Sequence, residues 1–475
     1  MMRPAATSTT STTKLPTPPD GSSRFSILVY AHTHWDREWY QPFERFRMML
    51  VHAVDRILDT LEAEPAFTTY VLDGQTIVLD DYLAIRPEAR PRIERLVRAG
   101  RLEVGPWYIL PDEFLVSGES LVRNLLEGRR GARAFGSELA VGYLPDPFGH
   151  VAQLPAVLAG FGIDSIVFSR GMGNEYAGLG PTFRWLAADL VTGITAVVQT
   201  STYTNGYCNA ELLSKPRTAT DDARIVPGLE AAVGLATHLA EEANTGTLVF
   251  AAGCDHETIN PQLPQLLDQL TGRIDGADIA ISGLAGIIAS IESSVAERAS
   301  RGETLAEYSG ELRGSWHAPI LAAIFSARIA LKQDNVRLQT RLERCIEPLV
   351  ALAGAGGVWR TDTALLRHAW KLALQNQPHD SIGGCSVDST HLDMPPRTRA
   401  AHQVCDSLVE DVLAALGQHE RDLVSNTAAT SAGGIVNRVV YGGSAHAVGA
   451  VAEGVTADTS VGDVTDVTDT FGEVM

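Results

Sequence analysis

The sequence lacks an excess of positive charge and any long apolar run. It has 38 Lys and Arg residues against 57 Asp and Glu residues, and its formal net charge is −19. This balance argues against a basic surface for nucleic acid. No stretch reaches the roughly 18 consecutive apolar residues that a membrane-spanning helix needs. We therefore expect neither a nucleic-acid partner nor a membrane partner.

Cysteine is also scarce. The five cysteines are scattered, odd in number and form no Cys-x-x-Cys pair. This pattern fits unpaired thiols in a reducing compartment better than a disulfide scaffold. Residues 1–23 are rich in Thr, Ser and Pro and lack the apolar run of a signal peptide, so we expect a disordered leader. Both observations favour the cytoplasm.

What the sequence does contain is 45% hydrophobic residues, enough for a large core. From residue 24 to about 300, apolar strand-like runs alternate with helical periods. The strand-like runs are 26–31, 68–72, 102–105, 139–144, 165–169, 194–199, 247–252 and 278–282. The main helical periods are 46–63, 88–99, 118–132, 226–242, 262–273 and 284–298. This alternation predicts an α/β domain with a parallel sheet, either open or closed into a barrel.

The pattern changes twice further along the chain. Residues 301–420 lose the strand signal and carry amphipathic periods at 317–338, 341–353, 363–376 and 396–418, which predicts a helical bundle. Residues 421–475 contain one strand-like run, 435–441, and then an acidic tail with few large apolar side chains. We interpret this last part as the start of a truncated β domain.

The first chemical motif, His-Thr-His-Trp-Asp-Arg-Glu-Trp at 32–39, follows the first strand directly. Residues two apart on a strand point to one face, so His32, His34 and Asp36 are expected to converge at its carboxyl end. Imidazole and carboxylate groups suit zinc or a similar divalent ion. The alternative is a strand end whose polar residues enter a loop.

Three further segments carry candidate groups. Asp146 lies between two prolines in Pro-Asp-Pro-Phe-Gly-His at 145–150, a stiff mount for a metal-bound or nucleophilic carboxylate, or simply a turn. Asp255 follows the strand at 247–252, where a general acid could lie, although an exposed loop residue is the simpler interpretation. His379 and Asp380 precede a glycine turn and could supply a remote ligand, or else end a helix.

Together, in chain order, these four segments resemble glycoside hydrolase family 38, the retaining α-mannosidases, and especially its bacterial branch. The resemblance runs from about residue 25 to 430. Other matching stretches are Gly-Pro-Trp-Tyr at 105–108, Pro-Asp-Glu-Phe at 111–114, Ser-Gly-Glu-Ser at 117–120 and Gly-Glu-Leu-Arg-Gly at 310–314. The resemblance implies a barrel-like catalytic domain at 24–300, and metal-dependent hydrolysis of terminal α-mannosides through a covalent glycosyl-aspartate.

The resemblance also implies roles for individual residues. One divalent ion, most readily Zn²⁺, is held by four ligands: His34, Asp36, Asp146 and His379. His32 then becomes an orienting residue. Asp146 is in addition the nucleophile, and Asp255 is the acid/base. The sugar is contacted by Trp39, Arg170 and Asp380. The expected partner is a mannose-containing glycan or glycoside, and a homo-oligomer is left open.

Two alternatives compete with an active α-mannosidase. Members of the family usually continue for several hundred residues of β-sandwich, so the first alternative is a truncated, inactive sugar- or metal-binding homologue. The second is a metal amidohydrolase of the same barrel class, because His-x-His after a first strand also opens those sites. A metal amidohydrolase would need further metal-binding histidines after later strands, and the sequence offers His256 but no convincing set.

Overall fold

The computed structural model describes residues 12–201, 205–215, 222–316, 318–357, 359, 363–418, 436–442 and 445–451. The chain divides into two compact units. The first unit comprises Met1–Ile329 and Gln377–Asp393, and the second comprises Ala330–Asn376 and Met394–Met475. A segment from late in the chain therefore belongs to the N-terminal unit, and it carries His379 and Asp380.

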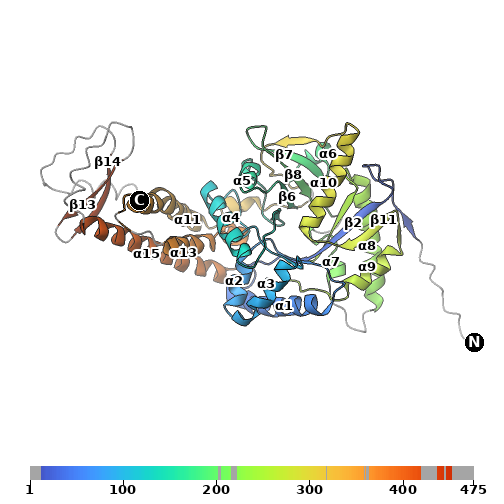
Figure 1. The fold of residues 1–475 in the computed structure, drawn as a ribbon, viewed down its shortest axis with the longest axis horizontal. Helices are drawn as coiled ribbons and strands as arrows, with labels where there is room; N and C mark the ends of the chain where they lie inside the picture. The colour runs from blue at the N-terminus through green and yellow to red at the C-terminus, as the bar shows by residue number, and fades with distance from the viewer. Residues whose placement is uncertain are drawn as a thin grey trace, which may run out of the picture. The chain divides into compact units, whose positions relative to one another are not determined.

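Strand β2 (Phe25–Thr33) is the centre of the first sheet. On one side it pairs in parallel with β9 (Thr247–Ala252), and on the other with β11 (Ala277–Ile281) and then β3 (Tyr70–Leu72). β3 in turn pairs with β4 (Leu102–Glu103). Figure 1 shows α8 (Asp222–Glu242) and α9 (Leu263–Thr271) beside β2 and β11. Helices cover this sheet, so its strands are apolar along their length, as buried parallel strands are.

The second sheet has the order β12-β7-β8-β6-β5. Its strands are β5 (Gly142–Leu144), β6 (Ser165–Phe168), β7 (Thr182–Leu186), β8 (Gly193–Val198) and β12 (Glu307–Ser309). β7 runs antiparallel to β8, while the other pairs are parallel. The predicted α/β class is confirmed. The closed barrel is not, because the described strands of this unit hydrogen-bond into separate sheets.

The two sheets share an apolar core. Tyr30 of β2 and Tyr143 of β5 meet there, with their hydroxyl oxygens 3.3 Å apart and their rings in a T-shaped contact at 6.1 Å. Gln199 donates a hydrogen bond to the Tyr30 hydroxyl. Helix α10 (Leu284–Ser300) adds its buried face to the same cluster. Both sheets thus pack against the same hydrophobic core. The candidate residues His34 and Asp36 follow the carboxyl end of β2, and Asp146 follows that of β5.

The longer helices of the first unit follow the predicted periods closely, whereas the helices of seven residues or fewer were not predicted. Helix α1 (Phe43–Ala63), for example, buries Leu50, Val54, Ile57 and Leu61, which lie on one helical face. The other helices are α2 (Ile77–Leu83), α3 (Arg90–Arg98), α4 (Gly118–Arg133), α5 (Leu154–Gly160), α6 (Tyr176–Leu179), α7 (Glu211–Ser214) and α14 (His379–Gly383). Short 3₁₀ turns occur at η1 (Pro87–Ala89), η2 (Gly206–Cys208) and η3 (Ala322–Phe325).

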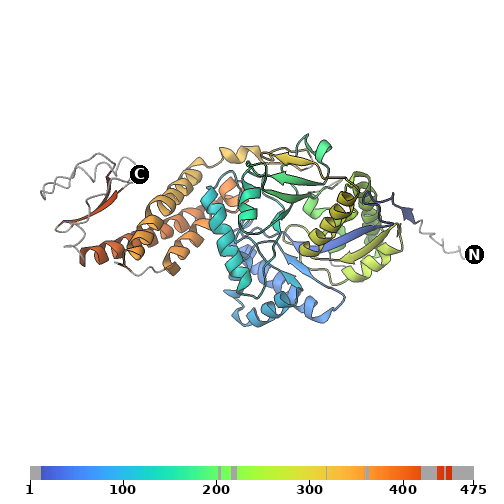
Figure 2. The same ribbon diagram turned by 45° about the horizontal axis from the view of Figure 1, so that its top comes forward.

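The second unit is helical in its described part up to residue 418. Its helices are α11 (Ile329–Arg341), the π-helical turn η4 (Leu342–Ile346), α12 (Glu347–Ala355), α13 (Thr363–Leu374) and α15 (Asp388–Gln418). α11, α13 and α15 run side by side in both views (Figures 1 and 2). Leu338, Trp370 and Leu408 meet in their common core. Further along, β13 (Val436–Gly442) and β14 (Ala445–Val451) form an antiparallel pair.

Three expectations need correction. Cys208 and Cys254 form a disulfide, so the expectation of unpaired cysteines is wrong for these two. They are 46 residues apart and meet only through the fold. In the predicted leader, β1 (Thr13–Lys14) pairs with β10 (Ile274–Asp275) and Leu15 is buried. Residues 1–11 of that leader lie outside the described residues. The helix predicted over 317–338 begins only at Ile329.

Among the described residues, no helix combines the length and apolar character that crossing a lipid bilayer requires.

At Gly128, helix α4 packs closely against the backbone of residues 106–108. A Cβ atom there would lie 2.1 Å from the Trp107 carbonyl carbon and 2.3 Å from the Pro106 oxygen, both backbone atoms. We expect Gly128→Ala to destabilise the protein by about 1–3 kcal/mol, because the added methyl group would overlap backbone atoms that cannot easily move away. Urea unfolding measures the change. Gly118→Ala, on the same helix with no atom within 4 Å of its Cβ, is the matched control. Equal stability of the two variants would contradict this packing.

Candidate functional site

The site begins where β2 ends. Beyond Thr33 the chain continues to pair with the segment after β9, and His34 and Asp255 form a parallel bridge. The His34 amide donates to the Cys254 carbonyl at 3.1 Å, and the His256 amide donates to the His34 carbonyl at 2.8 Å. Since parallel strands end at the same edge, His34 and Asp255 lie side by side there.

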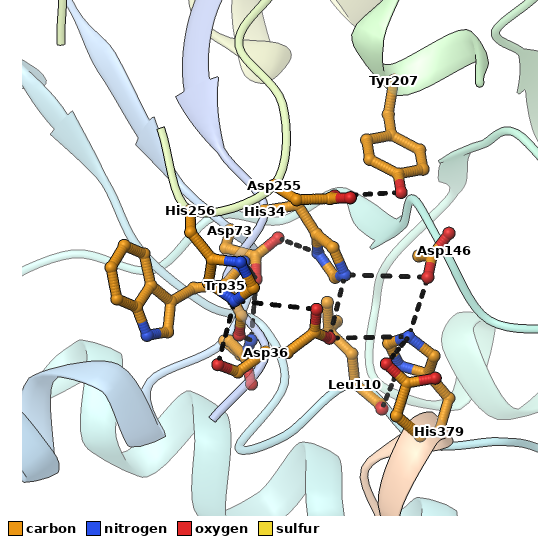
Figure 3. A network of polar contacts seen from close by, with 12 residues as sticks. His34, Trp35, Asp36, Asp73, Leu110, Asp146, Tyr207, Asp255, His256 and His379 are labelled. Carbon is orange, nitrogen blue, oxygen red and sulfur yellow. Dashed lines mark hydrogen bonds and ion pairs between the residues drawn. The ribbon is translucent and has the colours of Figure 1, made fainter. Parts of the chain in front are cut away.

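The structure brings the four predicted ligands together (Figure 3). His34 Nε2 lies 3.2 Å from Asp36 Oδ1 and 3.9 Å from Asp146 Oδ2. His379 Nε2 lies 2.9 Å from Asp146 Oδ2 and 3.6 Å from Asp36 Oδ1. All four residues are buried. Three segments far apart in the sequence therefore meet at one point.

This donor set fits a divalent cation. His34 Nε2 is buried and makes no hydrogen bond, although Asp36 and Asp146 approach it. Donor atoms of His34, Asp146 and His379 all lie within 4.8 Å of one another, as do those of Asp36, His379 and Asp380. Two imidazole nitrogens and two carboxylates are typical zinc ligands. A buried nitrogen without a hydrogen bond, facing two carboxylates, is where an ion would be expected.

The protonation of the two histidines reflects the charge around them. Burial alone would lower the pKa of each imidazole. For His34, the carboxylates of Asp73 and Asp36 outweigh burial and raise the pKa well above its usual range. For His379, Asp380 and Asp146 raise the pKa to about 9. An ion must displace these protons, because only a neutral imidazole is a ligand.

Asp73 is a site residue that the sequence analysis missed. His34 Nδ1 hydrogen-bonds to Asp73 Oδ1 at 3.0 Å, while Asp73 Oδ2 accepts from the Trp35 amide at 2.6 Å and from Gln75 Nε2 at 2.7 Å. A carboxylate can only accept here, so Nδ1 carries a proton, and once the imidazole is neutral the lone pair of Nε2 faces the cluster. Asp73 directly follows the strand run predicted at 68–72, and that position was the available signal.

The Asp146 loop is held rigidly. Gly149 has φ +102°, and a Cβ there would lie 2.6 Å from the Leu312 oxygen. The next residue, His150, hydrogen-bonds through Nδ1 to Glu113 at 2.6 Å and through its amide to Leu312 at 2.8 Å. Only glycine suits that conformation and approach. The loop therefore presents the Asp146 carboxylate in a defined place.

Asp146 is held as an anion. Burial would raise its pKa, but Arg170, whose Nε donates to Asp146 Oδ1 at 2.6 Å, and His379 together hold that pKa well below its usual range. Arg170 thus contacts the predicted nucleophile directly. Its guanidinium also donates to the Pro319 carbonyl.

Asp255 has a different environment. Burial, with the nearby negative charges of Asp36 and Asp146, raises its pKa to about 6. Its Oδ1 accepts a hydrogen bond from the Tyr207 hydroxyl at 3.1 Å. Tyr207 is a second residue that the sequence analysis missed, and no motif marks it. The Tyr207 carbonyl accepts from His32 Nε2 at 2.7 Å. His32 therefore supports Tyr207 and is not in the donor cluster, so the expected convergence of three strand-end residues is wrong for His32.

The three predicted sugar contacts surround the cluster. Trp39 is half-buried, and its ring stacks at 6.4 Å on His256, whose Nε2 lies 3.7 Å from Asp36 Oδ2. Asp380 Oδ2 lies 3.8 Å from His379 Nε2, and burial raises the pKa of Asp380 to about 7. Arg170 is the third, already described on Asp146. All three therefore lie next to groups of the cluster.

Family models decide the classification. Residues 24–311 match the glycosyl hydrolases family 38 N-terminal domain, and residues 320–416 match the alpha mannosidase middle domain. The chain belongs to glycosyl hydrolase family 38. The resemblance drawn from the four motifs is thereby confirmed.

Individual relatives agree. A Halalkalibacterium halodurans protein named "Putative mannosylglycerate hydrolase" is 34% identical over 386 residues, which are 78% of this chain and 40% of that protein. Human alpha-mannosidase 2C1 is 24% identical over 77% of this chain and 33% of its own length. The crystal structure of an alpha-mannosidase from Enterococcus faecalis V583 superposes with a TM-score of 0.73 at 31% identity, covering 83% of this chain and 43% of that one. The chain thus spans about two fifths or less of the length of the curated relatives named here.

Asp73→Asn tests the orientation of His34. Asn tolerates the positive φ of 50° at this position, so the backbone can stay in place. Its amide group can present a donor to His34 Nδ1, which would favour the proton on Nε2, the wrong tautomer for a ligand. We expect Zn²⁺ affinity to fall about 10- to 100-fold, measured by competition with a chromophoric chelator. Asp255→Asn is the control and should bind Zn²⁺ as the wild type does. An unchanged affinity in Asp73→Asn would contradict the role of Asp73.

Proposed function

We propose that this chain carries the catalytic site of a retaining α-mannosidase, which hydrolyses terminal α-mannosides through a covalent glycosyl-aspartate. The observation that supports this most is the contrast between two buried carboxyl groups beside one donor cluster. The pKa of Asp146 is held well below its usual range, and that of Asp255 is raised to about 6. Retaining glycosidases need one ionised nucleophile and one protonated acid.

In the proposed first step, an oxygen of Asp146 attacks the anomeric carbon and the glycosidic C–O bond breaks. Asp255 gives its proton to the departing oxygen. In the second step, water attacks the same carbon, Asp255 takes up the proton of that water, and the Asp146 carboxylate is released again. Arg170 supports this cycle by holding the nucleophile ionised and in place.

His34, Asp36, Asp146 and His379 would hold the divalent ion, for which Zn²⁺ is our proposal. When bound, such an ion supplies positive charge that stabilises anionic oxygens and orients the sugar hydroxyls. Around it, the ring of Trp39 offers an apolar face to the sugar, and Asp380 offers a buried carboxyl to a hydroxyl. Both residues position the substrate and do not react.

For the substrate we propose a mannose-containing glycan or glycoside. The name of the Halalkalibacterium halodurans relative brings small charged mannosides such as mannosylglycerate into this range. A truncated, inactive homologue is not favoured, because both carboxyl groups and all four donors come together in the described residues. A metal amidohydrolase is not favoured either, since residues 24–311, which include the His-x-His motif, match the family 38 N-terminal domain.

Substitutions of Asp146 and Asp255 should differ in their effect on metal binding. Asp146→Ala removes both the nucleophile and a ligand, so we expect hydrolysis of p-nitrophenyl α-mannoside and Zn²⁺ affinity to fall together. Asp255→Ala should lower turnover by about 10²- to 10⁴-fold and leave Zn²⁺ binding intact. Activity assays with and without chelator, together with metal analysis, check both. Equal metal loss in the two variants would show that the division of roles is wrong.

The stereochemistry of the product tests the nucleophile. Retention requires catalytic carboxyl groups about 5–5.5 Å apart, whereas inversion leaves about 6.5–9.5 Å for a water molecule. Asp146 and Asp255 follow strands of the two sheets, and we expect the short separation in a sugar complex. NMR of the sugar released from an α-mannoside should detect α-mannose first. If β-mannose is the first anomer formed, Asp146 is not a nucleophile.

A further inference from the structure

The disulfide between Cys208 and Cys254 lies at the acid/base group. Cys208 directly follows Tyr207, and Cys254 directly precedes Asp255, so the bridge joins the two residues that share the Tyr207–Asp255 hydrogen bond. The sulfur atoms and one carboxylate oxygen of Asp255 all lie within 4.8 Å of one another. The bridge therefore packs against the carboxyl group itself.

The backbone around the bridge shows what it adds. Asn209 already ties the Tyr207 segment to β9, because its side chain donates to the Val249 carbonyl at 3.1 Å and accepts from the Ala251 amide at 2.8 Å. Cys254 is held in the first sheet through the His34 amide. Both segments thus keep their place without the disulfide. Its specific effect is to fix the distance between Tyr207 and Asp255.

We propose that the Cys208–Cys254 pair is a thiol-controlled positioning site for the acid/base group, in which the disulfide form holds Tyr207 against Asp255 and the dithiol form releases it. The inference rests on the proposed role of Asp255. A small dithiol is the reductant by class: its two thiol groups give two electrons and two protons to the bridge and become a disulfide, so that Cys208 and Cys254 each end as a thiol.

Reduction of the Cys208–Cys254 disulfide changes the packing beside Asp255. Two separate thiols cannot remain at bonding distance, so the two cysteine side chains turn apart, and the distance between Tyr207 and Asp255 is no longer fixed. Cys254 is half-buried and Cys208 is buried, so we expect an attacking thiolate to reach Cys254 first. Asp255 would then lose the alignment of its proton with the departing oxygen. Neither cysteine nor Asp255 is among the four proposed metal ligands, and the backbone pairing of His34 with this segment does not depend on the disulfide, so metal binding should be unaffected.

The test uses the full chain loaded with Zn²⁺, in an oxidised and a reduced preparation. A phosphine serves as reductant, since it takes one oxygen from water, becomes a phosphine oxide and leaves two thiols, without competing strongly for zinc. Thiol titration after denaturation should find three thiols in the oxidised protein and five in the reduced protein, because the sequence has five cysteines. Five thiols in the oxidised preparation would overturn the proposal.

The kinetic readout compares two leaving groups through kcat/KM, which reports the first bond-breaking step. An alkyl α-mannoside needs a proton from the acid, and a dinitrophenyl α-mannoside does not. We expect reduction to lower kcat/KM about tenfold for the alkyl substrate and less than about twofold for the dinitrophenyl substrate, given what general acid catalysis contributes. An equal loss on both substrates, or no loss on either, would overturn the proposal, since a merely structural disulfide would not discriminate between them.

Variants separate this inference from the proposed function. The double variant Cys208→Ser with Cys254→Ser should show the reduced pattern in both preparations. Cys345→Ser, an exposed thiol of the second unit, should respond to the phosphine as the wild type does. A response that persists in the double variant would overturn the proposal. If Asp255→Ala keeps full activity on the alkyl substrate, the proposed acid/base role fails, whatever the thiols do.

Discussion

The structure depends on balancing negative charge that is buried around one point. Asp36, Asp146, Asp255 and Asp380 all lie at this point, and burying an unpaired carboxylate costs several kcal/mol. Arg170 offsets one such charge, and protons on His34 and His379 offset others. Where these cations do not suffice, the carboxyl group keeps its own proton, as the raised pKa of Asp380 indicates. A divalent ion would replace several protons at once, which is why such a cluster favours a metal.

The fold meets this requirement by bringing separate parts of the chain to one edge. His34 follows β2, Asp255 follows β9 and Asp146 follows β5, while His379 begins α14. The last of these is secured by backbone contacts, because the His379 amide donates to the Leu110 carbonyl at 3.0 Å.

The segment that receives His379 is itself fixed by α4. Asn124 accepts from the amides of Tyr108 and Ile109 at 2.8 and 3.0 Å, and donates to the Ile109 carbonyl at 2.9 Å. The close approach of Gly128 belongs to the same contact. Helix α4, which carries none of the proposed catalytic residues, thus fixes the segment against which His379, a proposed metal ligand, lies.

The sequence could predict those parts whose signal is local. The run at 26–31 predicted β2, and the helical period at 46–63 predicted α1, because burial imposes a regular spacing. The four candidate ligands were predictable only because recognisable motifs surround them. β7 was missed, since Arg184 interrupts its apolar run and its antiparallel pairing with β8 depends on a turn held by Asp189. The pairing of Cys208 with Cys254 and the contacts of Asp73 and Tyr207 depend on segments that only the fold brings together.

The contrast between the two catalytic candidates follows from what hydrogen-bonds to each. Asp146 receives a guanidinium at 2.6 Å and an imidazole at 2.9 Å, and both are donors that carry charge. Asp255 receives a hydroxyl at 3.1 Å, a neutral donor, beside the like charges of Asp36 and Asp146. A neutral donor orients a carboxyl group without forcing its proton off, whereas a cation would keep it ionised. For the acid/base role proposed for Asp255, a neutral donor such as Tyr207 therefore suits this position, whereas a lysine or arginine there would favour a second permanent anion.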